Sequence, residues 1–411
     1  MACQATLLVT GATLVTPVGA FAADLASADG RWVHVGPAGS FGGQAAQTLQ
    51  ADGLTALPGL VDVHVHFREP GVHAHKGTYA SESRAAAAGG VTCVLTMPNT
   101  NPFTDSPEQL EVVRDCARQS VIDYGFHFMA SGDNLDAMLA VRNVASHKLY
   151  LNETTGITSP LADESRLRDL LATGLPFMAH AEGDTLDMLL AVHAQWGTGP
   201  LHIGHVALAR EVEALRRVRA AGQWVTGEAS PHHLFLDETD AARLGPLGDM
   251  RPTLKSAADV AALWEGLADG TLEAIATDHA PHLLSDKQRV PAPPGVPGVQ
   301  TMLPLLLDAV AAGRLSLQDV ARLTSRGPAA IFRLQGKGQV TCGADADLVL
   351  VDTAAEQTIS NADQLTKPGW TPFDGRRVRG AVVRTLRRGE WVYADGEIVV
   401  EAGGQEVVVG R

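Results

Sequence analysis

The sequence predicts an α/β protein: a (β/α)8 TIM barrel with a small β-sandwich domain built from the N- and C-terminal segments. Eight apolar β-runs alternate with Ala-, Leu- and Arg-rich helical stretches between residues 57 and 335, and eight parallel strands are the number that closes such a barrel. Residues 1–56 and 336–411 instead hold short apolar runs broken by Gly, Pro and Asp, a pattern typical of antiparallel strands. We therefore expect the barrel over residues 57–335 and the β-domain over the two ends.

The first element that the sequence predicts is a strand and turn within residues 7–22, LLVTGATLVTPVGAFA. Its final Ala-Phe-Ala resembles a signal-peptide cleavage site. However, no Lys or Arg precedes Arg31, and Gly11 and Pro17 interrupt the apolar run, so a strand is favoured over a secretory signal. The barrel strands are expected at residues 60–67, 91–98, 124–131, 147–152, 175–182, 201–207, 224–231 and 272–281. Strands of the C-terminal segment are expected at residues 346–352, 381–400 and 406–410.

A doubly wound open sheet is the alternative architecture. It would need a glycine-rich phosphate-binding turn after its first strand, and HVHFREPG is not such a turn. The barrel is therefore favoured.

The composition excludes several classes of partner. The 32 Lys and Arg residues against 46 Asp and Glu residues give the 411-residue chain a net charge of −14, so we expect neither nucleic acid nor an anionic membrane as a partner. Four cysteines without a CxxC pair argue against a disulfide framework and a thiolate zinc site. No stretch is long and apolar enough to span a bilayer, and we expect a cytoplasmic protein.

Polar residues occur at the C-terminal ends of the predicted barrel strands, on the face where barrel active sites lie. His64 and His66 alternate along one strand and therefore face the same side. His180, His205 and Asp278 stand near the ends of three other strands. Four imidazoles and one carboxylate suit zinc or a similar divalent ion. The sequence therefore predicts a metal site.

These five ligands are more than one tetrahedral zinc with a reactive water requires, but two ions would need a bridging group. Lys148, at the end of the fourth predicted strand, is the candidate bridge. An ammonium group cannot ligate a metal, whereas a lysine carboxylated by CO2 would offer two anionic oxygens. From the sequence pattern alone an ordinary surface lysine is favoured, so the number of ions stays open.

Several segments together resemble dihydroorotases of the amidohydrolase superfamily: GLVDVHVHFREPG, TMPNTNP, HKLYLNETT, AHAE, GHV, EASPHHL and ATDHAPH. The closer resemblance is to the dihydroorotase domain of the multifunctional proteins of the pyrimidine pathway. It is carried by KLYLNET, PPGVPG, TMLPLLLDAVAAGRLSL and WTPFDG. The motifs follow one another in order over residues 55–400, and their combination is highly specific.

The resemblance implies two Zn2+ ions per chain, bridged by carboxylated Lys148 and by hydroxide. One ion would be held by His64, His66, Lys148 and Asp278, and the other by Lys148, His180 and His205. Asp278 would also be the general acid/base, which accepts the proton of the attacking water and passes it to the leaving nitrogen.

The substrate contacts begin with Arg68, two residues beyond His66. Strand alternation would place its guanidinium on the metal side, where it can bind a carboxylate with two hydrogen bonds; a structural salt bridge is the alternative. The resemblance implies that Asn99 and His282 contact the same carboxylate. It further implies contacts from Arg251 to the ring, from backbone groups of Pro294 and Gly295, and from Thr154 in a mobile loop over residues 152–160.

The sequence also departs from its closest relatives. Thr155 stands where they carry a bulky aromatic residue, so we expect the loop to close more weakly or to be gated differently. Gly204 stands where they carry a cysteine, which argues against an extra zinc held by that cysteine and the glutamate matching Glu228. We expect Glu228 to accept a hydrogen bond from a ligand imidazole instead. The adjacent His232 and His233 are expected on opposite faces of a strand, in structural roles.

The resemblance implies reversible hydrolysis of L-dihydroorotate to N-carbamoyl-L-aspartate, the third step of de novo pyrimidine biosynthesis. It also implies a homodimer and an association with aspartate transcarbamoylase. Two alternatives stay open. One is a hydantoinase, dihydropyrimidinase or allantoinase, against which Arg68 and Asn99 argue. The other is a non-catalytic scaffold for aspartate transcarbamoylase, against which the complete set of candidate ligands argues.

Overall fold

The structure is a computed structural model that describes residues 4–154, 156–157 and 161–410. In this part of the chain eight parallel strands form one sheet, in sequence order from β6 to β13. His66 N donates to His279 O at 2.8 Å beside a bridge between Val65 and His279, so the two outermost strands meet and nearly close a barrel. The predicted barrel is confirmed. Its strands are β6 (Leu60–Val65), β7 (Val91–Thr96), β8 (Asp123–Met129), β9 (Ser146–Tyr150), β10 (Phe177–His180), β11 (Leu201–Ile203), β12 (Val225–Ala229) and β13 (Ala274–Ile275).

Helices cover the outside of the barrel, and the residue before several of them caps the N-terminus. Thr78 accepts a hydrogen bond from Ser81 N while the Ser81 hydroxyl accepts one from Thr78 N, a capping box that starts α1. The longer helices are α1 (Tyr79–Ala88), α2 (Pro107–Ala117), α4 (Glu164–Leu171), α5 (Asp184–Trp196), α6 (Ala209–Ala220), α9 (Ala257–Asp269) and α11 (Met302–Ala311). The shorter ones are α3 (Leu135–Ala140), α7 (Pro231–Phe235), α8 (Glu238–Leu244), α10 (Leu284–Lys287), α12 (Leu317–Ala321) and α13 (Gly327–Ile331).

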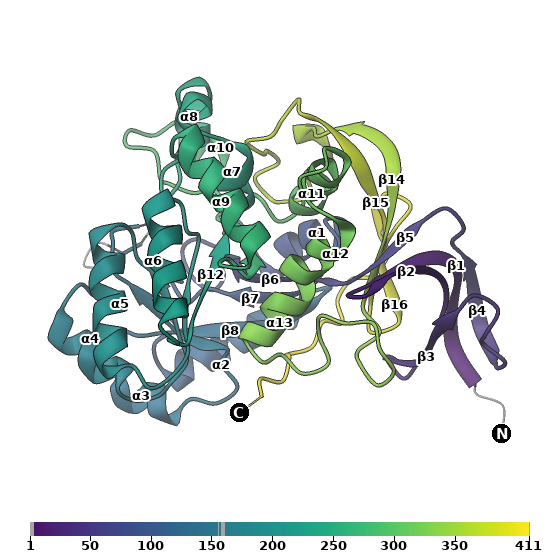
Figure 1. Cartoon of the computed structure of the whole chain (residues 1–411), viewed down its shortest axis with the longest axis horizontal. Helices are drawn as coiled ribbons and strands as arrows, with labels where there is room; N and C mark the ends of the chain where they lie inside the picture. Colours follow the sequence, from purple (N-terminus) through teal and green to yellow (C-terminus); the bar gives the residue numbers. More distant parts are fainter. Residues whose placement is uncertain (1–3, 155, 158–160, 411) are drawn as a thin grey trace.

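The two ends of the chain meet in a second, nine-stranded mixed sheet. Strand β5 pairs in parallel with β1 and antiparallel with β14, with Pro58 opposite Leu348. Helix α1 contacts both β7 of the barrel and β15 of this sheet, while α11 and α12 pack against β15 and β1. Figure 1 shows the sheet at the opposite end of the molecule from helices α3–α6. The expected β-domain built from both termini is confirmed. Its strands are β1 (Gln4–Thr16), β2 (Gly19–Ala28), β3 (Arg31–Pro37), β4 (Gln44–Gln50), β5 (Thr55–Pro58), β14 (Leu348–Thr358), β15 (Arg377–Arg387), β16 (Glu390–Ala394) and β17 (Glu397–Ile398).

Two local predictions are wrong. His232 and His233 lie in helix α7, which begins at Pro231, and not on a strand, because proline suits the first position of a helix. The run at residues 406–410 does not add a strand to the β-domain. Glu406 and Val409 form only isolated bridges, with Tyr124 and Leu334.

The described helices are short. The two longest, α5 and α9, have 13 residues each. Within the described ranges no helix has both the length and the apolar character needed to cross a membrane.

Candidate metal centre

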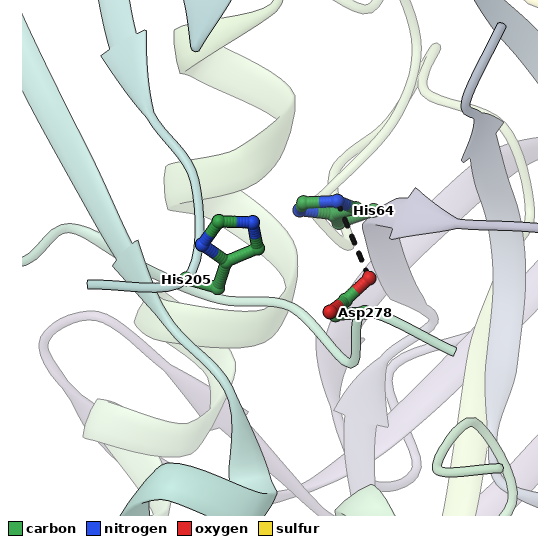
Figure 2. A group of neighbouring side chains, drawn as sticks. All are labelled: His64, His205 and Asp278. Carbon is green, nitrogen blue, oxygen red and sulfur yellow. Dashed lines mark ion pairs between the residues drawn. The ribbon is translucent and has the colours of Figure 1, made fainter. Parts of the chain in front are cut away.

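The predicted metal ligands meet at the C-terminal ends of the barrel strands. His64 lies in β6, Lys148 in β9 and His180 at the end of β10. His205 and Asp278 follow β11 and β13 by two and three residues. Figure 2 shows His64, His205 and Asp278 converging, and one ligand atom from each lies within 4.8 Å of the others.

Short contacts join the members of this cluster. Asp278 Oδ1 lies 3.4 Å from His64 Nε2 and 3.0 Å from His66 Nε2. His180 Nδ1 lies 2.8 Å from His205 Nε2. His205 and Asp278 adopt φ values of 37° and 46°, a left-handed backbone that non-glycine residues enter at a cost, often at functional sites.

Two imidazoles of the cluster donate a hydrogen bond to an oxygen acceptor from the nitrogen that faces away from it. His64 Nδ1 donates to Glu228 Oε1 at 2.5 Å, and His66 Nδ1 donates to Asn99 Oδ1 at 2.6 Å. His180 Nε2 lies 3.2 Å from Glu182 Oε1 without hydrogen-bond geometry. Hydrogen bonds of the first kind fix the tautomer of a metal-binding histidine, so the unprotonated nitrogens of His64 and His66 point into the cluster.

The protonation states of the histidines and of Asp278 favour metal binding in the same cluster. Burial lowers the pKa of His66 to about 4 and also lowers the pKa values of His180 and His205, which keeps these imidazoles neutral. Burial alone would raise the pKa of Asp278, but His64 and His66 outweigh it and hold that pKa well below its ordinary value. Neutral imidazoles and an ionised carboxylate are the forms that bind metal.

Glu228 stays an anion although it is fully buried. Its Oε2 accepts a hydrogen bond from His202 Nε2 at 3.0 Å, while Oε1 holds His64. Burial opposes ionisation, but the two histidines outweigh it and lower the pKa of Glu228. Glu228 therefore accepts the expected hydrogen bond from an imidazole of the cluster. A Cβ at Gly204 would lie 3.1 Å from His64 Cε1, so a larger side chain here would crowd that ligand.

Lys148 fits the role of an acceptor for CO2. Its side chain is 0% exposed, and its Nζ has no hydrogen-bond partner among the described residues. Burial lowers the pKa of Lys148 to about 8, which increases the share of the neutral amine, the form that reacts with CO2. A carboxylated lysine would add anionic oxygens to a set of imidazoles and one carboxylate, a donor set that suits divalent metal ions.

A small pocket opens beside the cluster, and most predicted substrate contacts line it. Arg68 reaches the pocket although β6 ends at Val65; it has a φ of 67°, so strand alternation does not explain its position. His282 is 0% exposed and lies behind Arg68, with its Nε2 3.1 Å from Arg68 Nη2. The lining residues are His66, Arg68, Asn99, Thr154, Arg251, Asp278, Ala280, Pro294 and Gly295.

The predicted loop over residues 152–160 is described only in part. Thr154 and Ile157 exchange two backbone hydrogen bonds, at 3.2 and 2.9 Å. Asn152 Oδ1 accepts hydrogen bonds from Glu182 N and from the Thr185 hydroxyl. The expectation for Thr155 lies outside the described residues.

Two buried lysines that the sequence pattern did not predict lie near the pocket. Lys76 Nζ lies 3.1 Å from His282 Nδ1, and Lys287 Nζ donates to the carbonyl oxygens of Asp249 and Pro293. No spacing in the sequence marks these lysines as buried. The only available signal was their position within the segments that carry Arg68 and His282.

Comparisons with known proteins agree with this geometry. The model of the amidohydrolase family matches residues 55–392. The chain is 38% identical over 384 residues to a dihydroorotase of Halobacterium salinarum, with 85% of this chain and 89% of that protein covered. The chain is also 41% identical over 367 residues to the multifunctional protein CAD of Squalus acanthias. That match covers 88% of this chain but only 16% of the multifunctional protein.

A solved structure extends the likeness to the whole fold. The L-hydantoinase (dihydropyrimidinase) of Arthrobacter aurescens superimposes with a TM-score of 0.93 at 26% identity, over 98% of this chain and 100% of that one. Fold, ligand cluster and sequence likeness point the same way. The chain belongs to the amidohydrolase family.

Proposed function

We propose that the chain is a dihydroorotase that catalyses the reversible hydrolysis of L-dihydroorotate to N-carbamoyl-L-aspartate, the third step of de novo pyrimidine biosynthesis. The observation that carries this proposal is one pocket in which Arg68 and Arg251 stand beside His66 and Asp278 of the metal-ligand cluster. Cations next to a hydrolytic centre suit a cyclic amide that also bears a carboxylate. The likeness to the Halobacterium dihydroorotase over most of both chains supports it.

The ligand set would hold two Zn2+ ions, with carboxylated Lys148 between them. His64, His66 and Asp278 would complete one site, and His180 and His205 the other. When bound, the ions supply an activated water or hydroxide and polarise the substrate carbonyl.

Asp278 moves the proton in the proposed reaction. Its carboxylate lies in the pocket and contacts the rings of His64 and His66. From there it can accept the proton of the attacking water and deliver it to the ring nitrogen that leaves, as general acid/base catalysis requires. In the reverse direction the same carboxylate removes a proton from the ureido nitrogen as the ring closes.

The end of the pocket that Arg68 and Arg251 line would orient the substrate. Arg68 and Asn99 would bind the ring carboxylate, with His282 placed against Arg68. Arg251 and the Pro294–Gly295 backbone would face the pyrimidine ring, and Thr154 lies at the same pocket. Hydantoinases share the fold of this chain. However, hydantoin and dihydrouracil lack the carboxylate that these cations would bind.

The test is a metal analysis paired with a substrate panel. We expect about two zinc ions per chain, hydrolysis of L-dihydroorotate and cyclisation of N-carbamoyl-L-aspartate, with much slower turnover of hydantoin, dihydrouracil and allantoin. A preference for hydantoin or allantoin would contradict the proposal and favour the alternative hydrolases. A metal-free, inert chain that binds aspartate transcarbamoylase would favour the scaffold role.

The Asp278→Asn variant tests the proton-transfer role. With metal retained, we expect turnover in both directions to be abolished, because the amide cannot accept a proton. Zinc content measured on the same sample is the control. Substantial activity with metal bound would exclude this role for Asp278.

The bridging role of Lys148 has a separate readout. Apoprotein reloaded with zinc and 13C-bicarbonate is expected to show a carbamate carbon signal in the NMR spectrum, which the Lys148→Met variant lacks. Full zinc loading without that signal would contradict carboxylation.

We further propose a cytoplasmic homodimer that associates with aspartate transcarbamoylase. The likeness to one region of a multifunctional protein supports an association with other pyrimidine-pathway activities. Sedimentation of the chain alone and with aspartate transcarbamoylase would test both points, with a monomer and no complex as the contradicting result.

A further inference from the structure

Four cations surround one end of the pocket in a chain whose net charge is −14. Arg68 and Arg251 line the pocket itself. Lys76 and Lys287 lie behind them, with side chains that are only 7% and 1% exposed. Burying a lysine costs free energy because the ammonium loses its hydration. The proposed chemistry, as described above, uses neither lysine.

Lys76 and Arg68 approach the same imidazole from opposite sides. Lys76 Nζ lies 3.1 Å from His282 Nδ1, and Arg68 Nη2 lies 3.1 Å from His282 Nε2. Asp286 Oδ2 lies 3.8 Å from Lys76 Nζ. Burial, together with the positive charges of Arg68 and Lys76, lowers the pKa of His282 far below its ordinary value, so the ring stays neutral.

A neutral imidazole has one N–H and one acceptor nitrogen, and an arginine can only donate. When protonated Lys76 donates to Nδ1, the hydrogen of His282 must sit on Nε2. The backbone of Pro294, which can only accept, then takes this hydrogen bond. The guanidinium of Arg68, whose Nε donates to Pro281 O at 3.2 Å, still lines the pocket, where a carboxylate is the acceptor that suits it best. His282 Cδ2, the atom bonded to Nε2, would lie 3.2 Å from a Cβ at Gly295 of the pocket lining.

Lys287 joins the two backbone segments on the other side of the pocket. Its Nζ donates to Asp249 O and Pro293 O, each at 2.9 Å. Arg251 follows the first segment by two residues, and Gly295, whose N–H donates to Asp249 O at 2.9 Å, follows the second. Both acceptors of Lys287 are neutral carbonyls; the carboxylate of Asp249, which also pairs with Arg251, is the anion that acts most on its charge.

The two lysines are also linked through one tryptophan. The indole Nε1 of Trp370 donates to His282 O at 2.7 Å, and Lys287 Nζ lies 5.9 Å from the centre of the Trp370 ring. A displacement of either lysine would therefore also shift Trp370 or His282, and His282 contacts Arg68.

We propose that Lys76 and Lys287 are positioning residues that make this end of the pocket selective for an anionic group on the substrate. Lys76 sets the hydrogen of His282 toward the Pro294 backbone of the pocket, next to Arg68, and Lys287 holds the segments of Arg251 and Gly295 together. This role rests on the proposed dihydroorotase function. It adds two residues that would make the enzyme prefer a cyclic amide with a ring carboxylate.

The experiment compares the zinc-loaded wild type with the Lys76→Met and Lys287→Met variants. For each variant we expect the KM for L-dihydroorotate to rise about tenfold or more, with kcat changed less than about threefold, because ground-state orientation is lost and the reacting groups are intact. Inhibition by orotate, which bears the carboxylate, should weaken in parallel, whereas weak inhibition by dihydrouracil should not change. Lys76→Arg should restore part of the affinity for orotate.

Lys367→Met is the matched control, since it removes one positive charge from an exposed lysine that reaches Ala74 of the same segment as Lys76. It should behave as the wild type. If a methionine variant does not fold, the corresponding glutamine variant, which keeps a donor but not the charge, carries the same expectation.

The outcomes separate the two levels of the proposal. A wild type without dihydroorotase activity would overturn the proposed function itself. An active wild type whose lysine variants keep the same KM, or lose orotate and dihydrouracil binding equally, would overturn the positioning role alone.

Discussion

At the scale of single residues, the metal centre depends on the groups that hold the ligands. The carboxylate of Glu228 fixes His64, the amide oxygen of Asn99 fixes His66, and Glu182 lies beside His180. The first two contacts leave the Nε2 atoms of His64 and His66 unprotonated. Loss of such a partner typically weakens metal binding without removing a ligand.

We therefore expect Glu228→Gln to lower zinc affinity about 10- to 100-fold, because the amide can no longer accept strongly charge-assisted hydrogen bonds from both His64 and His202. Competition with a chelator of known affinity measures the change. The control is Glu406→Gln, because the carboxylate of Glu406 binds Arg114 and Asn143, away from the metal ligands. Equal zinc affinity in both variants would exclude the positioning role of Glu228.

Lys287 predicts a pH dependence of substrate affinity. Burial lowers the pKa of Lys287 to about 8; Asp249 opposes this shift, and Arg68, Arg251 and Lys76 add to it. Because the ammonium loses its proton above that pH, we expect the KM for L-dihydroorotate to increase as pH rises through about 8. In Lys287→Met the side chain is neutral throughout, so the same increase should be smaller. Identical pH profiles would contradict this assignment.

At the scale of secondary-structure elements, the sequence predicted the barrel strands well because parallel strands buried on both faces form continuous apolar runs. All eight appear in the expected order, although β13 spans only Ala274–Ile275 of the expected run at residues 272–281. The proposed ligands were predicted from their places at the C-terminal ends of these strands, and the structure brings them together there. The structure of residues 231–235 could not, since EASPHHL reads equally as a strand end or a helix start. Neither could Lys76 and Lys287, because their burial depends on contacts between distant segments.

The segment before Val296 owes its path to Gly295, which adopts a φ of 127°. A Cβ there would lie 2.8 Å from both Cβ and O of Ala280. We expect Gly295→Ala to displace this segment from the pocket, with a cost of about 1–3 kcal/mol in stability and a higher KM for L-dihydroorotate. Thermal unfolding and steady-state kinetics measure the two effects.

Gly343→Ala is the control for that substitution, since Gly343 also has a positive φ, of 88°, but a Cβ there meets nothing within 4 Å. It should lose some stability through backbone strain and keep the KM of the wild type. A raised KM in both variants would show that backbone strain, and not the contact with Ala280, is responsible.

At the scale of the whole molecule, one buried ion cluster ties the barrel to the β-domain. Lys337 Nζ contacts the carboxylates of Asp123 in β8, Asp345 at 3.0 Å and Asp347 at 2.7 Å. Arg388, the residue after β15, binds Asp123 and Asp345 as well. Burial alone would lower the pKa of Lys337, but Asp347 and Asp123 outweigh it and raise that pKa. The lysine therefore stays charged.

We expect Lys337→Met to lower the free energy of unfolding by about 3–5 kcal/mol, because it leaves buried carboxylates without their cation. Chemical denaturation followed by fluorescence measures the loss. Lys367→Met, at an exposed site, should change stability by less than about 0.5 kcal/mol. If the free energy of unfolding falls no further in Lys337→Met than in this control, the stabilising role of the buried ion cluster would be contradicted.

The pairing of β5 with β14 also determines the order in which the molecule can be completed during synthesis. Strand β5 leads directly into β6, which carries the proposed ligand His64, yet its antiparallel neighbour is made only after the whole barrel sequence. At a translation rate of about 5–20 residues per second, that neighbour follows about 15–60 seconds later. Until then one edge of β5 stays open, and exposed strand edges recruit other chains. The nascent protein therefore passes through a period in which a chaperone or rapid barrel folding must protect that edge.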